Sequence, residues 1–296
     1  MKFSLVLATV EKTAEVERFL ASLMNQTYQD FELVLVDQNR DNRLEPILTS
    51  YYDEFPILHL RSETGLSRAR NVGLQHISGD IVAFPDDDCW YPNNLLQKVA
   101  NFYDLNPKCG GFTGRSVDNA CRTTFRKWDK TDGPVNRFNV WSRGISFTIF
   151  LTRNSVEKAG CFNETLGVGA NTPWGSGEET DYLLRVLRLG TRVYYDHNII
   201  VYHPESIKDF GAATLNKVFQ YGRGMGRVLR LNEYPVWFVA YSLMRPLTGS
   251  IFSLIQARVG KGLYHWKIFQ GRFMGYFSVS EVSSKPNLIV EEVSIT

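Results

Sequence analysis

The sequence predicts an α/β protein with a mixed, mostly parallel sheet flanked by helices and followed by a C-terminal helical extension. Apolar, β-prone runs alternate with helical patterns over the first third of the chain, which is the order expected of βαβ units. Polar residues follow the ends of these runs. After about residue 210 the composition becomes basic and aromatic. A chain of 296 residues can bury a sizeable core around such a sheet.

The predicted elements of the first third can be placed from hydrophobic periodicity. Four strands are expected at residues 3–8, 31–36, 57–60 and 81–84, with helices between them at 13–24, 43–52 and 66–77. The start of the chain is apolar, like a short signal core, but acidic residues follow at Glu11 and Glu15, which favours a first strand. In a parallel sheet with crossover helices, the carboxyl ends of the strands meet at one edge and bind ligands there.

Three consecutive acids, Asp86, Asp87 and Asp88, directly follow the fourth predicted strand. Neighbouring carboxylates repel one another and are costly to bury unpaired, and a divalent cation resolves both problems. Oxygen ligands suit Mg²⁺ or Mn²⁺. An isolated run of three Asp can also form a solvated turn or cap a helix. Its position at the carboxyl end of a buried strand favours the ligand-binding interpretation.

Two further polar strand ends are expected at the same edge. Thr9 and Glu11 follow the first strand, and Asp37 follows the second. Together with the acids they suit a nucleotide, although Asp37 is equally typical of a turn in its polar loop. Arg70 lies near the start of a helix that opens at Gly65, where phosphates are favoured. Such arginines also cover helix faces, and no Walker or dinucleotide glycine pattern is present.

The order of Asp37, the stretch 65–73 and the stretch 84–88 resembles the family 2 glycosyltransferases of the GT-A fold, over roughly residues 3 to 205. The later residues resemble some bacterial members that build surface polysaccharides. This resemblance implies a catalytic domain at 1–209, with a nucleotide-binding half at 1–105 and an acceptor half at 106–209, before the extension at 210–296. It also implies a nucleotide-sugar donor, a divalent metal and inversion at the anomeric carbon.

The same resemblance assigns roles to the strand-end residues. Asp37 would contact the base, Asp86 the ribose or sugar, and Asp88 the metal that bridges the diphosphate. The donor site would comprise Thr9, Glu11, Asp37, Arg70, Asp86 and Asp87. The loop after Asp37 reads Gln-Asn-Arg where the family usually has Asp-Gly-Ser, which leaves the base open between a UDP- and a dTDP-sugar, with a UDP-sugar expected first. His203 matches a metal-ligating histidine of several GT-A enzymes, or is structural. His197 is expected in a turn.

An acidic pattern opens a predicted helix at 177–187. Glu178, Glu179 and Asp181 suit its first turn through the helix dipole alone. Inverting members of the family carry a Glu-Asp pair here, whose second acid is the base that takes a proton from the attacking hydroxyl. Glu179 occupies that second place, and Glu178 or Asp181 remain alternatives because Glu179 replaces an Asp.

Two segments are candidates for the acceptor side. The glycine-rich loop 167–177, which contains Trp174, either closes over a substrate or is a simple connector. The stretch 221–227, which contains Arg223, either binds acceptor phosphates or forms a bend between helices. We assign Trp174 and Arg223 to acceptor binding.

The C-terminal region is basic, with Glu233 as its one acid between 210 and 276. Two apolar stretches, 235–244 and 247–255, are separated by Arg245 and Pro246, and each is too short to span a bilayer. We expect in-plane amphipathic helices on anionic lipid, with a helical hairpin packed on the catalytic domain as the alternative. Residues from about 283 are interpreted as a tail or an edge strand.

Composition sets the remaining limits. A net charge of +2 gives no argument for nucleic-acid binding, and the four cysteines have neither metal-ligand spacing nor a disulfide framework, as expected for a cytosolic protein. The sequence therefore predicts a metal-dependent inverting glycosyltransferase that acts on a glycan or polyprenol-linked acceptor, peripheral at the inner face of the plasma membrane. A sugar-nucleotide nucleotidyltransferase would need a glycine-rich N-terminal loop with a basic residue, which is missing. A non-catalytic glycan-binding protein is the other alternative.

Overall fold

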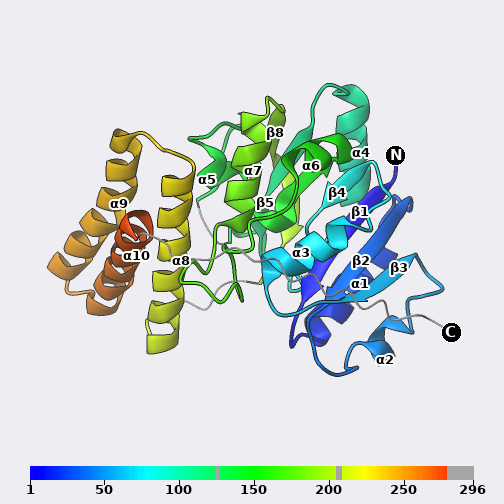
Figure 1. Cartoon of the computed structure of the whole chain (residues 1–296), viewed down its shortest axis with the longest axis horizontal. Helices are drawn as coiled ribbons and strands as arrows, with labels where there is room; N and C mark the ends of the chain where they lie inside the picture. Colours follow the sequence, from blue (N-terminus) through cyan, green and yellow to red (C-terminus); the bar gives the residue numbers. More distant parts are fainter. Residues whose placement is uncertain (125–126, 205–208, 279–296) are drawn as a thin grey trace.

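The computed structural model describes residues 1–124, 127–204 and 209–278 and centres on one eight-stranded sheet (Figure 1). The strand order is β3-β2-β1-β4-β7-β5-β8-β6. The strands are β1 (Phe3–Thr9), β2 (Phe31–Asp37), β3 (Ile57–Arg61), β4 (Ile81–Ala83), β5 (Gly111–Val117), β6 (Gly133–Pro134), β7 (Ile149–Thr152) and β8 (Val193–Tyr202).

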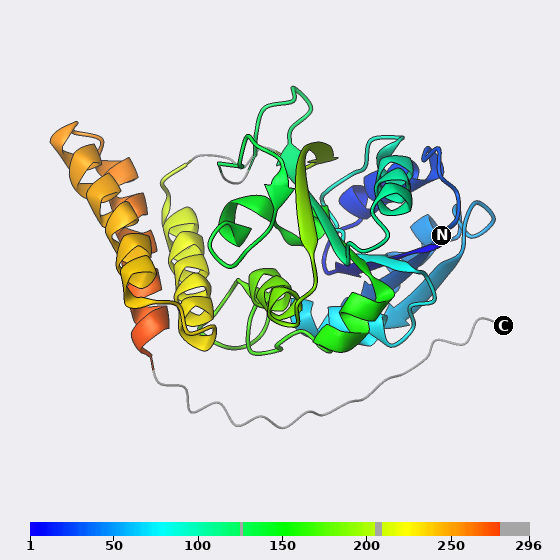
Figure 2. The ribbon, with the colours of Figure 1, turned by 90° about the horizontal axis from the view of Figure 1, so that it is seen from above.

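Helices cover the sheet and then form a separate layer beside it. Those that connect the strands are α1 (Ala14–Met24), α2 (Glu45–Leu48), α3 (Leu66–Leu74), α4 (Leu95–Leu105), α5 (Val140–Arg143), a 3₁₀ turn η1 (Ser146–Thr148), α6 (Arg153–Ala159) and α7 (Glu178–Arg188). The last three are α8 (Ala212–Leu231), α9 (Val236–Ile255) and α10 (Val259–Phe277). Figure 2 shows these three stacked together at one side of the sheet.

The sheet is mixed, as the sequence predicted. β1 pairs in parallel with β2 and β4, and β2 with β3, while β7 runs antiparallel to β4 and β5. β5 is parallel to β8, and both therefore run in the same direction as β4. All seven residues of β1 are buried because helices cover both faces of the sheet. The carboxyl ends of the parallel strands consequently share one edge.

Two predicted elements differ from the structure in the first two thirds of the chain. The helix expected at 43–52 is only α2, because the following residues form tight turns that bring Phe55 against Phe31, with ring centroids 5.2 Å apart. His197, expected in a turn, lies within β8. A register shift against β5 between Thr113 and Arg115 lets the two predicted strand segments continue as one strand.

The prediction that Arg245 and Pro246 interrupt the C-terminal apolar stretch is wrong, because α9 runs through both residues. Proline has no backbone N–H, so Pro246 cannot bond the carbonyl of Ser242 one turn earlier. Arg272 of α10 replaces that donor, with its Nη1 2.7 Å from the oxygen of Ser242. A neighbouring helix therefore repairs the break. At 20 residues, α9 is long and apolar enough to cross a membrane by length and composition.

Glycines allow α8 and α10 to pack closely. A Cβ at Gly222 would lie 2.9 Å from the oxygen of Ile268, and one at Gly226 would collide with the oxygen of Arg272. Desolvation in this contact lowers the pKa of the Arg272 guanidinium to about 10. The residues expected to form a tail or edge strand, from about 283, lie outside the described part of the chain.

We predict that Arg272→Met lowers the free energy of unfolding by about 1–3 kcal/mol, because the buried carbonyl of Ser242 then has no donor. Pro246→Ala supplies a main-chain N–H for that oxygen, so the same substitution made in the Pro246→Ala background should cost clearly less. Urea unfolding of the four proteins forms a double-mutant cycle. If Arg272→Met lowers the free energy of unfolding equally in both backgrounds, the hydrogen bond to the Ser242 carbonyl is not the source of the stability that Arg272 provides.

Candidate active site

The carboxyl ends of β1, β4 and β8 bring the predicted acids together with two of their predicted neighbours. Thr9 Oγ1 donates to Asp87 Oδ2 at 2.8 Å, and His203 Nε2 lies 2.9 Å from Asp88 Oδ1. Asp86 is positioned by a bridge to Ala8 of β1. The ends of three strands, which are far apart in the sequence, thus form one acidic cluster.

The cluster carries more negative charge than its surroundings balance. Desolvation raises the pKa of Asp86, and it raises the pKa of Asp87 to about 6 together with the charges of Asp88 and Asp86. Burial alone would also raise the pKa of Asp88, but the hydrogen bond and charge of His203 lower it. Carboxylates whose pKa values are raised by burial and by the charges of their neighbours are the environment that a divalent cation stabilises.

His203 is oriented in the way that metal-ligating histidines usually are. Its Nδ1 lies 2.8 Å from the carbonyl oxygen of Pro204, which leaves Nε2 directed at Asp88. Phe147 stacks on the ring with a centroid distance of 5.2 Å and fixes its plane. Carboxylate oxygens and an imidazole are ligand types that Mn²⁺ or Mg²⁺ sites use, and Asp88 and His203 are the two such groups that meet here.

Arg70 joins the acidic cluster to the first turn of α7. Its Nη2 donates to Asp86 Oδ1 at 2.9 Å and its Nη1 to Glu178 Oε1 at 3.2 Å, and its side chain is fully buried. Burial raises the pKa of Glu178, and the charge of Glu179 raises it further. The sequence predicts Arg70 among the donor ligands. Here the guanidinium bridges two carboxylates in the interior.

The three acids of α7 point to different partners. Glu178 faces Arg70, whereas Asp181 accepts from Arg185 Nη2 at 3.1 Å and from Asn232 Nδ2 at 2.9 Å. Glu179 borders a small cavity together with Phe84, Ser146, Tyr182 and other residues. Ser146 Oγ in turn donates to Asp86 at 3.0 Å. Of the three, Glu179 is the acid that lines a small cavity with Ser146, a hydrogen-bond partner of Asp86.

Asp37, the last residue of β2, is fully buried and bonds to the loop that follows. Its Oδ1 accepts from the main-chain N and the Nδ2 of Asn39, at 2.8 and 2.7 Å, and His59 Nε2 lies 3.3 Å from its other oxygen. Asn39 Oδ1 also accepts from the main-chain N of Glu11 at 2.7 Å. Asn39, which the sequence analysis did not single out, thus ties the ends of β1 and β2 together. The sequence signal that could have identified Asn39 is an Asn placed two residues after an Asp in a polar loop.

The predicted acceptor residues are held in the packing of the 167–177 loop against α8. Trp174 is buried, with the guanidinium of Arg227 4.5 Å from its ring centroid. Ser176 Oγ donates to the carbonyl of Tyr221 at 2.9 Å, and Arg223 lies over Phe219. The loop is therefore fixed to α8 along much of its second half.

Tyr221 of α8 is a site residue that the sequence analysis did not single out individually. Desolvation raises the pKa of its hydroxyl to about 12, and the charges of Glu178 and Asp86 add to the shift. The side chain is nevertheless 37% exposed. An exposed aromatic ring within electrostatic range of both acidic groups indicates that α8 contributes to the wall of the site.

A second acidic group lies elsewhere on the molecule. Asp132, Asp196 and His197 hold ligand atoms close enough together for one metal ion. They lie at the surface, however, and Asp132 Oδ1 already pairs with His197 Nδ1 at 2.5 Å. Exposed groups of this kind are common without a metal, so the strand-end cluster remains the better candidate.

A Rossmann-like mixed sheet with an Asp-rich strand end, and with further acids in the first turn of the nearby helix α7, is the arrangement of a glycosyltransferase of the GT-A class. The chain belongs to Glycosyl transferase family 2, whose family model matches residues 4–160. That match includes the acidic cluster and Arg70 and ends before α7.

Curated relatives agree with this assignment. Glycosyltransferase AglE of Haloferax volcanii is 24% identical over 242 residues, which are 78% of this chain and 75% of AglE. Glycosyltransferase GlyA of Streptococcus pneumoniae is 33% identical over 108 residues, which are 31% of this chain and 16% of GlyA. The chain therefore spans three quarters of one relative and a small part of the other.

Solved structures share the fold. Residues 1–349 of TarS from S. aureus superpose with a TM-score of 0.61 at 18% identity, covering 99% of this chain and 98% of that one. The mannosyltransferase PcManGT of Pyrobaculum calidifontis, solved with GDP-Man and Mn²⁺, gives a TM-score of 0.63 at 12% identity, covering 93% and 87%. The predicted GT-A fold is confirmed.

We predict that Arg70→Met destabilises the protein by about 3–5 kcal/mol, because two acids then lose a buried cation. The control is Arg68→Met on the same helix, which removes only exposed pairs with Glu63 and Glu164 and should cost at most about 1 kcal/mol.

The cost of Arg70→Met should also depend on pH. Asp86 and Glu178 have raised pKa values in the folded protein, so the penalty of keeping them ionised is full above those values and is relieved as the pH falls and they protonate. Urea unfolding at pH 8 and pH 5 measures this. A cost that does not change with pH would contradict the bridging role.

Proposed function

We propose that this glycosyltransferase transfers a sugar from a UDP- or dTDP-sugar to a glycan or polyprenol-linked glycan, with inversion, in the synthesis of a surface polysaccharide. The observation that supports it most directly is the Arg70 bridge, which holds a strand-end acidic cluster and an acidic helix turn in one site. The neighbours give further support. TarS has been solved with UDP and with UDP-GlcNAc, and PcManGT with GDP-Man and Mn²⁺.

On the donor side, we assign the nucleotide to the β1 and β2 ends and the diphosphate to the acidic cluster. Thr9, Glu11 and Asp37 line the nucleotide end, and Asp86 and Asp87 follow towards the sugar. Asp88 and His203 would hold the metal. When bound, Mn²⁺ or Mg²⁺ neutralises the charge that develops on the leaving diphosphate. Arg70 contributes indirectly, by fixing the carboxylate of Asp86 in place.

On the acceptor side, we assign Glu179 as the base. A sugar hydroxyl is a poor nucleophile at neutral pH, and a positioned carboxylate can accept its proton as the new bond forms. Glu179 holds the second place of the acidic pair and lines a small cavity with Ser146, which donates to Asp86, and this position supports it as the base. Attack from that side with the diphosphate leaving opposite inverts the anomeric carbon. Trp174 and Arg223 would support the acceptor from the loop and α8.

We also propose that the division near residue 209 separates a catalytic domain from a membrane-associating extension at the cytoplasmic face. Residues 236–278 contain five basic residues and no acidic residue. Several large apolar side chains of α9 and α10 are exposed, among them Phe252 and Ile255. Such a surface suits anionic lipid. The exposed apolar residues at both ends of α9 support peripheral binding. The alternative is that α9, which is continuous and long enough, inserts into the membrane.

We predict that one nucleotide sugar from a panel of UDP-, dTDP- and GDP-sugars is consumed in the presence of Mn²⁺, and that EDTA stops its turnover. Asp88→Ala should reduce kcat at least about 100-fold while leaving the thermal midpoint within a few degrees, since a catalytic metal supplies several kcal/mol. Full activity of Asp88→Ala in EDTA would refute the metal assignment.

We predict that Glu179→Gln retains donor binding and loses transfer by about 100-fold or more, because the amide cannot accept the proton. Asp181→Asn is the matched control on the same helix turn and should retain most of the transfer rate. Donor affinity by calorimetry and transfer kinetics distinguish the two effects. If Asp181→Asn or Glu178→Gln is the inactive variant that still binds donor, the base assignment is wrong.

A further inference from the structure

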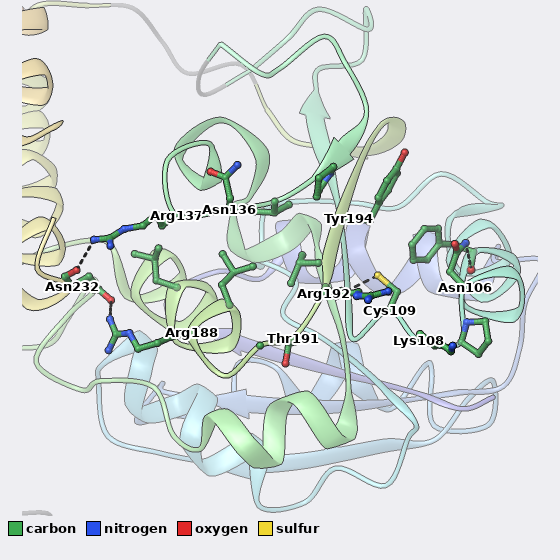
Figure 3. A pocket seen from close by; sticks show the side chains of 18 of the residues that line it. Asn106, Lys108, Cys109, Asn136, Arg137, Arg188, Thr191, Arg192, Tyr194 and Asn232 are labelled. Carbon is green, nitrogen blue, oxygen red and sulfur yellow. Dashed lines mark hydrogen bonds between the residues drawn. The ribbon is translucent and has the colours of Figure 1, made fainter. Parts of the chain in front are cut away.

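A cavity of about 1130 Å³ lies at the amino ends of β5 and β8 (Figure 3). Its walls come from the end of α4, the residues around β6, the second half of α7, the start of β8 and the link between α8 and α9. The acidic cluster lies at the opposite, carboxyl edge of the sheet. The ten residues of β8 span about 30 Å between the two edges. This cavity, called the groove below, is therefore separate from the proposed transfer site.

Two arginines in the groove are held in place by the same neutral residue. Arg188 Nη2 donates to Asn232 Oδ1 at 2.6 Å, and Arg137 Nη2 donates to the carbonyl oxygens of Asn232 and Glu233 at 3.1 Å each (Figure 3). Arg137 also stacks on Tyr234, with its guanidinium 4.9 Å from the ring centroid. The acceptors are amide and main-chain oxygens, so they orient the two guanidinium groups without neutralising them.

Two more cations, Lys108 and Arg192, lie along the groove and are exposed. Glu233 is the one acid among the lining residues. Within the described ranges, none of the four basic side chains forms an ion pair with a carboxylate. Arginine presents several donors in a planar fork, which matches phosphate, and two pre-oriented forks lose little entropy when an anion binds.

The floor of the groove is apolar. Val135, Leu184 and Val193 are buried beneath it, and Leu231 is partly exposed at its α8 end. Beyond that end, Phe138 and Trp237 continue the apolar surface, with ring centroids 5.3 Å apart and Trp237 61% exposed. A free inorganic anion would use the cations and leave this surface in water. An anionic group attached to a hydrocarbon chain would use both.

We propose that the groove binds an anionic phospholipid, with the headgroup phosphate between Arg137 and Arg188 and an acyl chain on the apolar floor. This site is distinct from donor and acceptor binding and does not depend on the proposed function. It is connected to the catalytic helix, however, because Asn232 also donates to Asp181 in the first turn of α7. A bound headgroup would thus contact the two arginines that donate to Asn232, the residue that is bonded to this turn.

The test uses soluble short-chain lipids and a reporter within the groove. Cys109 lines the groove and is half-buried, so its alkylation rate reports occupancy in a Cys121→Ser/Cys161→Ser background. The remaining cysteine, Cys89, is fully buried. Dihexanoyl phosphatidylglycerol below its micelle concentration should slow alkylation saturably. Dihexanoyl phosphatidylcholine, with the same chains and no net charge, and inorganic phosphate should each bind at least tenfold more weakly.

Charge-reversed variants test whether the lipid binds at the basic residues of the groove. Arg137→Glu/Arg188→Glu reverses the two exposed charges assigned to the headgroup phosphate and should weaken phosphatidylglycerol binding at least tenfold. Lys98→Glu/Lys158→Glu makes the same charge change on exposed positions of α4 and α6 outside the groove and should change it less than twofold. Calorimetry gives the affinities, and circular dichroism checks that each variant folds.

Several outcomes would overturn the proposal. Equal protection by the two lipids would indicate a site for hydrocarbon alone, and equal affinity for inorganic phosphate would indicate an anion site without a lipid. Absence of saturable binding, or the same loss in both charge-reversed variants, would exclude a specific site in the groove.

Discussion

The buried guanidinium of Arg70 is the interaction on which the two halves of the site depend. One side of it holds Asp86 after β4 and the other holds Glu178 at the start of α7. Removing a cation from water is costly unless charged partners replace the water, so the bridge forms only if both carboxylates are in place. This requirement fixes the distance between a strand end and a helix turn that are 92 residues apart in sequence, at positions 86 and 178. A loosely packed site could not hold two acidic groups this close.

The helices after the sheet contribute to the same site. α8 packs against the 167–177 loop on one side, through Ser176 and Tyr221, and against α10 on the other. Glycines on both faces make these contacts close. Burial raises the pKa of the Tyr221 hydroxyl and the charges of Glu178 and Asp86 raise it further, so this part of α8 lies near the acids. The C-terminal helices are therefore joined to the 167–177 loop by the direct packing of α8.

Charge is distributed unevenly between the two edges of the sheet. The carboxyl edge collects acids that a cation would balance, and the amino edge collects arginines and a lysine in the groove. A net charge of only +2 conceals both regions, since the excesses cancel in the sum. α7 connects them, with Glu178 and Glu179 at its first turn and Arg188 at its last residue. The helix dipole favours acids in the first turn and basic residues in the last turn. The acidic end of α7 lies at the carboxyl edge of the sheet, and its basic end lies at the amino edge.

The sequence by itself determined the class of fold, the first four strands and the acidic cluster, because hydrophobic periodicity and an Asp run at a strand end are local signals. It also placed Thr9 beside that cluster, since parallel strands share an edge, whereas His203 was expected there only from the resemblance to GT-A enzymes. Only the tertiary structure decided the partners of Arg70, the different directions of Glu178, Glu179 and Asp181, and the continuity of α9 through Pro246. Each of these depends on a contact with a residue distant in sequence, such as Asn232 for Asp181 or Arg272 for the carbonyl of Ser242, and local patterns carry no information about such contacts.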